Sequence, residues 1–302
     1  MNYYNEIKEQ IINNEITKRV KDYSKNKSDL TTYYNVGKLL SEAGKHYGEG
    51  IIKEYSRKLT QEFGKKYTER TLRRFKQFYN LYIEAKWSTV STKLSWSHYC
   101  ELLILDDINK INYFINICES QNLSIRELRE RIKSNEYERL DENTRLKLIN
   151  KDEPKVEDLI KNPIIIKNSS NYEIISEKVL QKLIMEDIPS FLDELGTGFT
   201  FIRNEYKIKL GDKYNYLDLL LYNIKYHCYV VIELKITELK KEHIGQIQMY
   251  MNYIDKNIKT VDENKTIGII IVKKNDKYVM EYCSDDRILA KEYELVWLTK
   301  NH

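Results

Sequence analysis

The sequence predicts an all-α amino-terminal domain followed by an α/β domain in which helices flank a mixed sheet, an α+β chain overall. Three observations support this. The chain has 302 residues, a length at which one core usually stops growing. Apolar residues recur at three- and four-residue steps up to about residue 140, and strand-like runs begin only near residue 199. We therefore predict a helical domain at 1–140, a linker at 141–168 and a second domain at 169–302.

The first part of the helical domain contains a segment that is typical of helix, turn, helix. Thr68 is the expected N-cap of its second helix, over 69–79. The outward face of that helix carries four basic side chains, Arg70, Arg73, Arg74 and Lys76. Such a helix could enter a DNA groove, or its basic face could simply be solvated, and the sequence leaves both interpretations open.

A second segment of the same kind covers 94–129. Ser124 is the expected N-cap there, and Glu127 completes a capping box. This segment is similar to the helix-turn-helix region of ParB-like proteins. We expect His98 to be a packing or capping residue rather than a metal ligand.

Composition limits where the protein works. No stretch is apolar enough to cross a bilayer, and the amino terminus lacks the pattern of a secretory signal, so we expect a soluble, cytoplasmic protein without a membrane partner. The net charge of +4 is too modest to establish a nucleic-acid partner by itself. The four cysteines lie far apart, which predicts reduced, mostly packed thiols rather than a metal knuckle.

The second domain is predicted from its order of patterns. Two of the three prolines fall in the expected linker, at Pro154 and Pro163. The expected elements after it are a helix at 176–195 kinked near Pro189, strands at 199–210, 214–223 and 226–235, a helix at 238–255, a strand at 266–272, an amphipathic stretch at 278–290 and a strand at 294–298. The core order is therefore αβββαβ.

One cluster of charges stands out from this apolar background. Glu233 and Lys235 follow the apolar run 229–232, and they share one face because side chains on a strand alternate. Asp218 interrupts the equally apolar strand 216–221. Hairpin geometry can bring the three side chains together.

An acid in a strand that is otherwise buried costs several kcal/mol unless it is paired or binds a cation. A salt bridge between Asp218 and Lys235 is one explanation. The other is that Asp218, Glu233 and the carbonyl of Leu234 supply hard oxygen ligands to Mg²⁺, with Mn²⁺ as a substitute, while Lys235 acts on a water. Phosphodiester hydrolysis suits that second arrangement, and spacing alone does not decide between the two.

The blocks 191–196, 199–206, 216–220, 231–235 and 245–250 together resemble the YhcG-type PDDEXK nuclease domain. The helical half, especially 87–140, also resembles the amino-terminal domain that accompanies it. The resemblance implies a restriction-endonuclease-like fold. It further implies that Asp218, Glu233 and Lys235 are the catalytic residues and that the reaction is hydrolysis of a DNA backbone.

The resemblance also extends to flanking positions. Glu194, near the end of the helix before the sheet, is expected to support metal binding, its alternative being an ordinary exposed acid. Gln246 and Tyr250 lie four residues apart on one helix face and look like a Gln-xxx-Tyr signature, although Tyr250 could be core. Arg203 is an expected phosphate contact. Leu217 stands where the eponymous motif has proline, a position without a chemical role.

These observations combine into one expectation, a Mg²⁺-dependent DNA nuclease that acts on duplex or branched DNA in bacterial defence or restriction. Expected partners are DNA, a second copy of the chain in a homodimer, and proteins of a restriction or defence system. RNA as substrate stays open. The alternative from another class is a non-catalytic DNA-binding or assembly protein that uses the PDDEXK fold as a scaffold.

Overall fold

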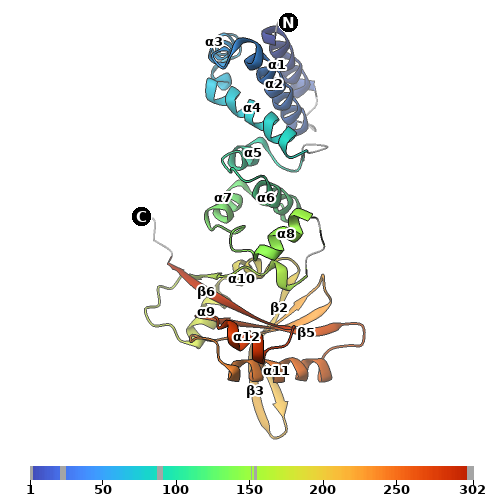
Figure 1. Ribbon diagram of the computed structural model, residues 1–302, viewed down its shortest axis with the longest axis vertical. Coiled ribbons are helices and arrows are strands. Elements are labelled where there is room, and N and C mark those ends of the chain that lie inside the picture. Colours follow the sequence, from blue (N-terminus) through green and yellow to red (C-terminus); the bar gives the residue numbers. More distant parts are fainter. Residues whose placement is uncertain (1–2, 21–24, 87–90, 151, 153–154, 298–302) are drawn as a thin grey trace. The chain divides into compact units, whose positions relative to one another are not determined.

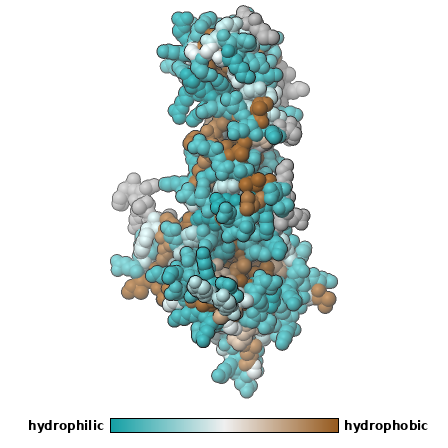
Figure 2. Space-filling view, in the orientation of Figure 1, coloured by the Kyte–Doolittle hydropathy of each residue, from teal (hydrophilic) through white to brown (hydrophobic). Residues whose placement is uncertain are grey.

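The computed structural model describes residues 3–20, 25–86, 91–150, 152 and 155–297. The chain forms two compact units, Met1–Asn135 and Glu136–His302. Helices make up the first unit, and a mixed sheet with helices makes up the second (Figure 1), so the predicted fold class is confirmed. Hydrophilic residues cover most of the visible surface of each unit (Figure 2). None of the described helices is long and apolar enough to span a membrane.

The helical unit is built around its first four helices. Its described helices are α1 Tyr3–Val20, α2 Lys25–Tyr47, α3 Ile51–Phe63, α4 Glu69–Glu84, α5 Trp96–Leu102, α6 Ile108–Gln121 and α7 Ile125–Lys133, with a 3₁₀ turn at Lys65–Tyr67. Helices α1 to α4 share a core that includes Ile7, Leu40 and Leu72. Gly37 on α2 lets α4 approach closely, because a Cβ there would lie 2.1 Å from the carbonyl oxygen of Phe75.

The expected helix starts are confirmed by their hydrogen bonds. The Thr68 hydroxyl caps α4 by accepting from the Thr71 N–H at 3.4 Å. Ser124 and Glu127 form the predicted capping box of α7. His98 completes a second box with Ser95 and contacts the Leu123 carbonyl through Nε2 at 3.0 Å, which makes it a capping residue.

The second unit follows the predicted order and adds a helix and a strand at its amino-terminal end. Its elements are α8 Glu142–Asn150, a 3₁₀ turn at Glu157–Leu159, β1 Ile164–Asn168, α9 Glu177–Glu186, α10 Ile188–Leu195, β2 Phe199–Leu210, β3 Lys213–Asn223, β4 Cys228–Leu234, α11 Lys241–Asn257, β5 Asn264–Val272, α12 Lys277–Cys283 and β6 Ile288–Trp297. The sheet has the order β1-β6-β5-β4-β3-β2. Strands β2, β3 and β4 form the expected antiparallel meander, and the remaining neighbours are parallel.

Two apolar clusters cover the two faces of this sheet. Val230, Ile232 and Leu234 pack with α9 and α10 on one face. Val231, which lies between them in the sequence, packs with α11 on the other face, as strand alternation requires. Figure 1 shows α11 running along its face of the sheet. The middle strands are therefore buried on both sides.

The segment 141–168, predicted as a linker, belongs instead to the folded unit. It contains α8 and β1, and β1 pairs in parallel with β6 in the register Ile164 to Tyr293. The apolar part of β1 is short and directly follows Asn162-Pro163, so the sequence there is more typical of a linker than of a strand. Pro154 and the predicted strand end at Leu298 lie outside the described residues. Strand β6 begins at Ile288, six residues earlier than expected.

Candidate functional site

The first part of the site lies at the carboxyl end of β4. Glu233 is buried, and Lys235 follows on the same face with its side chain 11% exposed. The Lys235 ammonium donates to Glu233 Oε1 at 2.8 Å. The Lys235 backbone N–H donates to the Ile271 carbonyl at 2.8 Å, so hydrogen bonding to β5 extends as far as Lys235. The predicted juxtaposition of Glu233 and Lys235 is present.

Asp218 joins them at the point where β3 and β4 separate. The last pair of residues between β3 and β4 is Leu219 and Ile232. Beyond that pair, the Leu234 N–H donates to Asp218 Oδ2 at 2.8 Å. The Gln181 amide of α9 donates to the Asp218 carbonyl at 2.9 Å. Among the described residues no ion pair joins Asp218 to Lys235, so the simple salt-bridge explanation is not what holds this acid in place.

Burial shifts the ionisation of both carboxylates. It raises the pKa of Glu233 to about 7, and the neighbouring charge of Asp218 adds to the rise against the opposing effect of Lys235. Burial also raises the pKa of Asp218, opposed by the Leu234 N–H and by Lys235, while Glu177 and Glu205 raise it further. The two acids therefore destabilise each other's charged form, a situation that a bound cation relieves.

One oxygen of these two carboxylates has no hydrogen-bond partner. Glu233 Oε2 is buried and makes no hydrogen bond. Buried polar atoms are nearly always paired, so this oxygen is available as a ligand for a cation. Among the described residues no three His, Cys, Asp or Glu side chains converge to hold a metal by themselves. Two carboxylates, a backbone carbonyl such as that of Leu234, and water or substrate oxygens would complete the donor set, which fits Mg²⁺.

A third acid that we did not predict approaches from α9. Glu177 Oε2 lies 3.5 Å from the Lys235 ammonium. Ser176 caps this helix, which places Glu177 in its first turn. A signal for it existed in the sequence, because Glu177 and the buried Gln181 are four apart on a helix whose other inward residues are apolar.

Glu194 does not reach this cluster. Its carboxylate forms a buried ion pair with Arg139, in which Arg139 Nη2 lies 3.0 Å from Glu194 Oε1, and it accepts the Ile165 N–H at 2.9 Å. The hydrogen bond from the Ile165 N–H places the Glu194 carboxylate beside β1. In the sheet, β1 lies three strands from β4, which corresponds to about 14 Å at ordinary strand spacing. Glu194 therefore ties α10 to the sheet edge, contrary to the expected support of a metal.

The predicted pair on α11 borders the acids. The Gln246 amide donates to the Tyr250 hydroxyl at 3.1 Å. Tyr250 is buried in the cluster under α11, so it is a core residue as well. Burial raises the pKa of Tyr250, and the charges of Glu233 and Asp218 add to the rise, which places the phenol within the field of both carboxylates.

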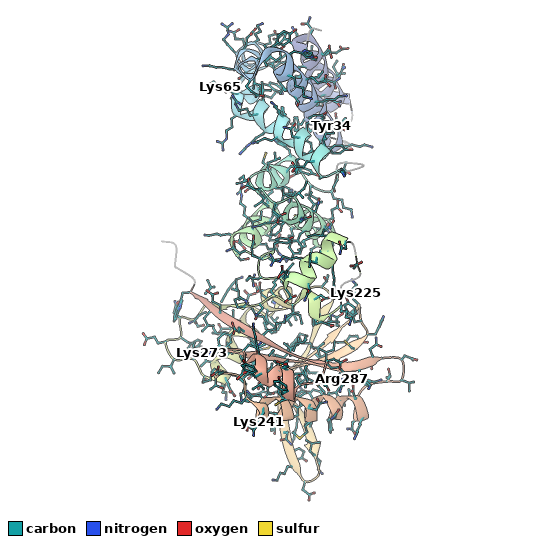
Figure 3. All side chains as sticks on the ribbon, in the orientation of Figure 1. Tyr34, Lys65, Lys225, Lys241, Lys273 and Arg287 are labelled. Atoms are coloured by element: carbon teal, nitrogen blue, oxygen red, sulfur yellow. The ribbon has the colours of Figure 1, made fainter. Side chains whose placement is uncertain are left out.

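The basic residues expected to contact nucleic acid lie in both units. On α4, Arg73 pairs with Glu69 at 2.7 Å and Lys76 pairs with Glu49. Arg70 and Arg74 lie close enough to Cys100 for their charges to act on its thiol. Lys65, before α4, points away from its ribbon (Figure 3). Arg203 is exposed on β2 opposite Leu220, in the other unit.

Known proteins match the chain in two blocks. Residues 157–301 match the family described as YhcG PDDEXK nuclease domain, and residues 6–139 match the DUF1016 N-terminal domain. The Escherichia coli (strain K12) protein named "Putative nuclease YhcG" is 22% identical over 309 residues, which cover 87% of this chain and 82% of that protein.

Similar solved structures include a repair endonuclease from Pyrococcus abyssi, with 20% identity over 41% of this chain and 49% of that chain and a TM-score of 0.30. EndoMS in a complex with double-stranded DNA matches at 18% identity over 43% of this chain and 50% of that chain, with a TM-score of 0.28. The chain thus spans about half the length of these structures.

Proposed function

We propose that the chain, whose residues 6–139 match the DUF1016 N-terminal domain and whose residues 157–301 match the YhcG PDDEXK nuclease domain, is a metal-dependent nuclease that hydrolyses phosphodiester bonds in DNA. The reaction centre of this proposal is the cluster of Asp218, Glu233 and Lys235. Gln246 and Tyr250 border it from α11, and Glu177 borders it from α9.

The observation that carries the proposal is the unpartnered oxygen of Glu233. A buried Glu233 Oε2 without a hydrogen bond beside a second carboxylate is costly in a purely structural cluster. A scaffold protein would gain stability by replacing these acids with apolar residues. A site that holds a divalent cation needs the same two acids.

The side chains divide the chemistry between them. A divalent cation held by Asp218 and Glu233 would neutralise phosphate charge and lower the pKa of a bound water. Lys235, held by Glu233 at 2.8 Å and by Glu177 at 3.5 Å, keeps its ammonium beside the place where negative charge develops. The Leu234 N–H fixes Asp218 in one orientation, which preorganises the pair before substrate arrives.

The proposal for the helical unit is that it engages duplex or branched DNA. Arg70 and Arg74 are its best candidates for phosphate contacts, since Arg73 and Lys76 already pair with acids. A role in bacterial defence or restriction belongs to the same proposal and is supported by the resemblance. Survival of cells that carry wild-type or Asp218→Asn protein, after challenge with phage, tests that role.

Cleavage tests the nuclease activity directly. Supercoiled plasmid, linear duplex and branched DNA are incubated with Mg²⁺, Mn²⁺ or EDTA and with wild type, Asp218→Asn, Glu233→Gln or Lys235→Met. Asp262→Asn, which changes an exposed acid on the same unit, is the matched control. We expect metal-dependent cutting by wild type and the control, and a loss of at least about a hundredfold in the three site variants. Equal cutting by Asp218→Asn and wild type would refute the assignment.

A further inference from the structure

The β2–β3 hairpin continues well beyond the acid cluster. Its strands pair as far as Leu210 and Lys213, across a two-residue turn in which Gly211 has a φ of +59°. Figure 1 shows this distal part of the hairpin projecting past α11. Lys213, at the tip of the paired region, lies five residues before Asp218, which corresponds to about 17 Å of strand.

The hairpin changes its buried face at the acid cluster. Leu219 packs into the cluster under α9 and α10, whereas Leu217 packs into the cluster under α11, although residues two apart on a regular strand share a face. Glu205 lies between Asn204 and Tyr206, which pair with Leu219 and Leu217, and it has a φ of +47°. This irregularity rotates the distal hairpin, so that Ile208 and Leu217 face α11.

The opposite face of the distal hairpin is exposed and interleaves aromatic with basic side chains. Tyr214 and Tyr216 are 55% and 53% exposed. Lys209 and Lys207 are their paired neighbours on β2. The Lys207 ammonium lies 3.8 Å from the centroid of the Tyr214 ring, and that of Lys209 lies 5.9 Å from it. The four side chains therefore form one surface, which we name the hairpin platform.

The charge of this platform is available to a ligand. Within the described part of the chain no ion pair engages Lys207, Lys209 or Lys213, whereas Arg73 and Lys76 of α4 are neutralised by acids. Asp212, at the turn, is the one acid between residues 206 and 217. Exposed aromatic rings beside unpaired lysines are the arrangement that binds single-stranded nucleic acid, with bases stacked on the rings and phosphates on the cations.

We propose that the hairpin platform binds an unpaired segment of a DNA strand, with bases stacked on Tyr214 and Tyr216 and phosphates contacting Lys207 and Lys209. Asp218 continues the same strand, two residues beyond Tyr216, so the bound segment leads toward the acid cluster. The substrate class that follows is DNA with a single-stranded part, such as a flap, a fork or a branch. The platform's role in delivering a substrate rests on the proposed nuclease function, but a binding measurement without cleavage can test whether the platform binds the strand.

Fluorescence anisotropy of the full chain in EDTA measures binding without cleavage. The probes are a labelled single-stranded oligonucleotide and the duplex of the same sequence. The test variant is Tyr214→Ala with Tyr216→Ala. The matched control is Tyr278→Ala with Tyr282→Ala, two exposed tyrosines on α12. We expect the hairpin variant to weaken single-strand binding by at least about tenfold, with less effect on the duplex, and the control to bind like wild type.

Salt dependence tests the lysines separately. Lys207→Gln with Lys209→Gln should reduce the magnitude of the negative slope of log K against log salt by about 1.4 if both lysines contact phosphates of a single strand. Unchanged single-strand affinity in the tyrosine variant, an equal loss in the α12 control, or a wild type that does not bind the oligonucleotide would each overturn the proposal.

The two proposals fail separately. If the platform variants lose single-strand binding while wild type cuts nothing with Mg²⁺, the nuclease proposal fails and the platform proposal stands. If wild type cuts DNA and the platform variants bind the oligonucleotide as wild type does, the platform proposal fails and the nuclease proposal stands.

Discussion

Replacing Glu233 by glutamine should make the second unit more stable at alkaline pH in the absence of metal. The carboxyl pKa rises from its ordinary 4.5 to about 7 in the folded protein, and each pKa unit is worth 1.36 kcal/mol. Below about pH 4.5 both states carry the proton and there is no penalty. Between the two values the folded state binds more protons, so stability falls as the pH rises, by about 3 kcal/mol once the pH exceeds 7.

The measurement is urea unfolding of the full chain in EDTA at several values between roughly pH 5 and pH 8. Glutamine keeps the shape of the side chain but cannot ionise, so Glu233→Gln should lose most of this pH dependence. Glu173→Gln, at an exposed acid of the same unit, is the control and should follow wild type. Saturating Mg²⁺ should reduce the difference, because a cation stabilises the ionised pair. Parallel pH profiles for wild type and Glu233→Gln in EDTA would refute the reasoning.

Three other changes have distinct expected results. Glu194→Gln removes a charge from the buried pair with Arg139 and should destabilise the second unit by about 3 to 5 kcal/mol in urea, without loss of Mg²⁺ affinity in the folded protein; a specific loss of metal affinity would restore the metal-supporting role. Gly37→Ala should destabilise the helical unit by about 1 to 3 kcal/mol in thermal melts, because its Cβ would meet the carbonyl of Phe75; an unchanged melt would contradict that packing. Glu177→Gln should lower the cleavage rate and leave urea unfolding nearly unchanged, and equal cleavage rates would exclude it from the site.

The sequence was sufficient to predict that Asp218, Glu233 and Lys235 lie close together, and to predict the main order of the fold. Glu233 and Lys235 were predictable because strand alternation is a strict rule, and Asp218 because it interrupts an apolar strand. The prediction placed Glu194 wrongly, because the sequence shows that its helix precedes the sheet but does not show which strand the end of that helix reaches. It lies beside β1, whereas Glu177, seventeen positions earlier, starts the helix that reaches β4.

A short strand and a local backbone irregularity were the other sources of difference between the prediction and the structure. Strand β1 has five residues, and its pairing with β6 joins segments more than a hundred residues apart, which no local pattern contains. The rotation of the distal hairpin at Glu205 was equally hidden, because a non-glycine residue with a φ of +47° is uncommon and has no sequence signature. The hairpin platform follows from that rotation, so it could be found only in the structure.

Asp218 has one structural task, and under the proposed function it has a second, and together they explain why an acid interrupts this strand. Strands β3 and β4 stop pairing after Leu219 and Ile232, so β3 supplies no carbonyl to the Leu234 N–H. Asp218 Oδ2 takes that place at 2.8 Å, and a buried N–H left without it would cost about 1 to 3 kcal/mol. Its other oxygen takes no part in that hydrogen bond. An Asp218→Asn substitution can keep the hydrogen bond to the Leu234 N–H but removes the negative charge. An Asp218→Leu substitution removes both. The strand ending thus supplies the structural reason for a carboxylate at this position, and under the proposed function the same carboxylate holds the cation.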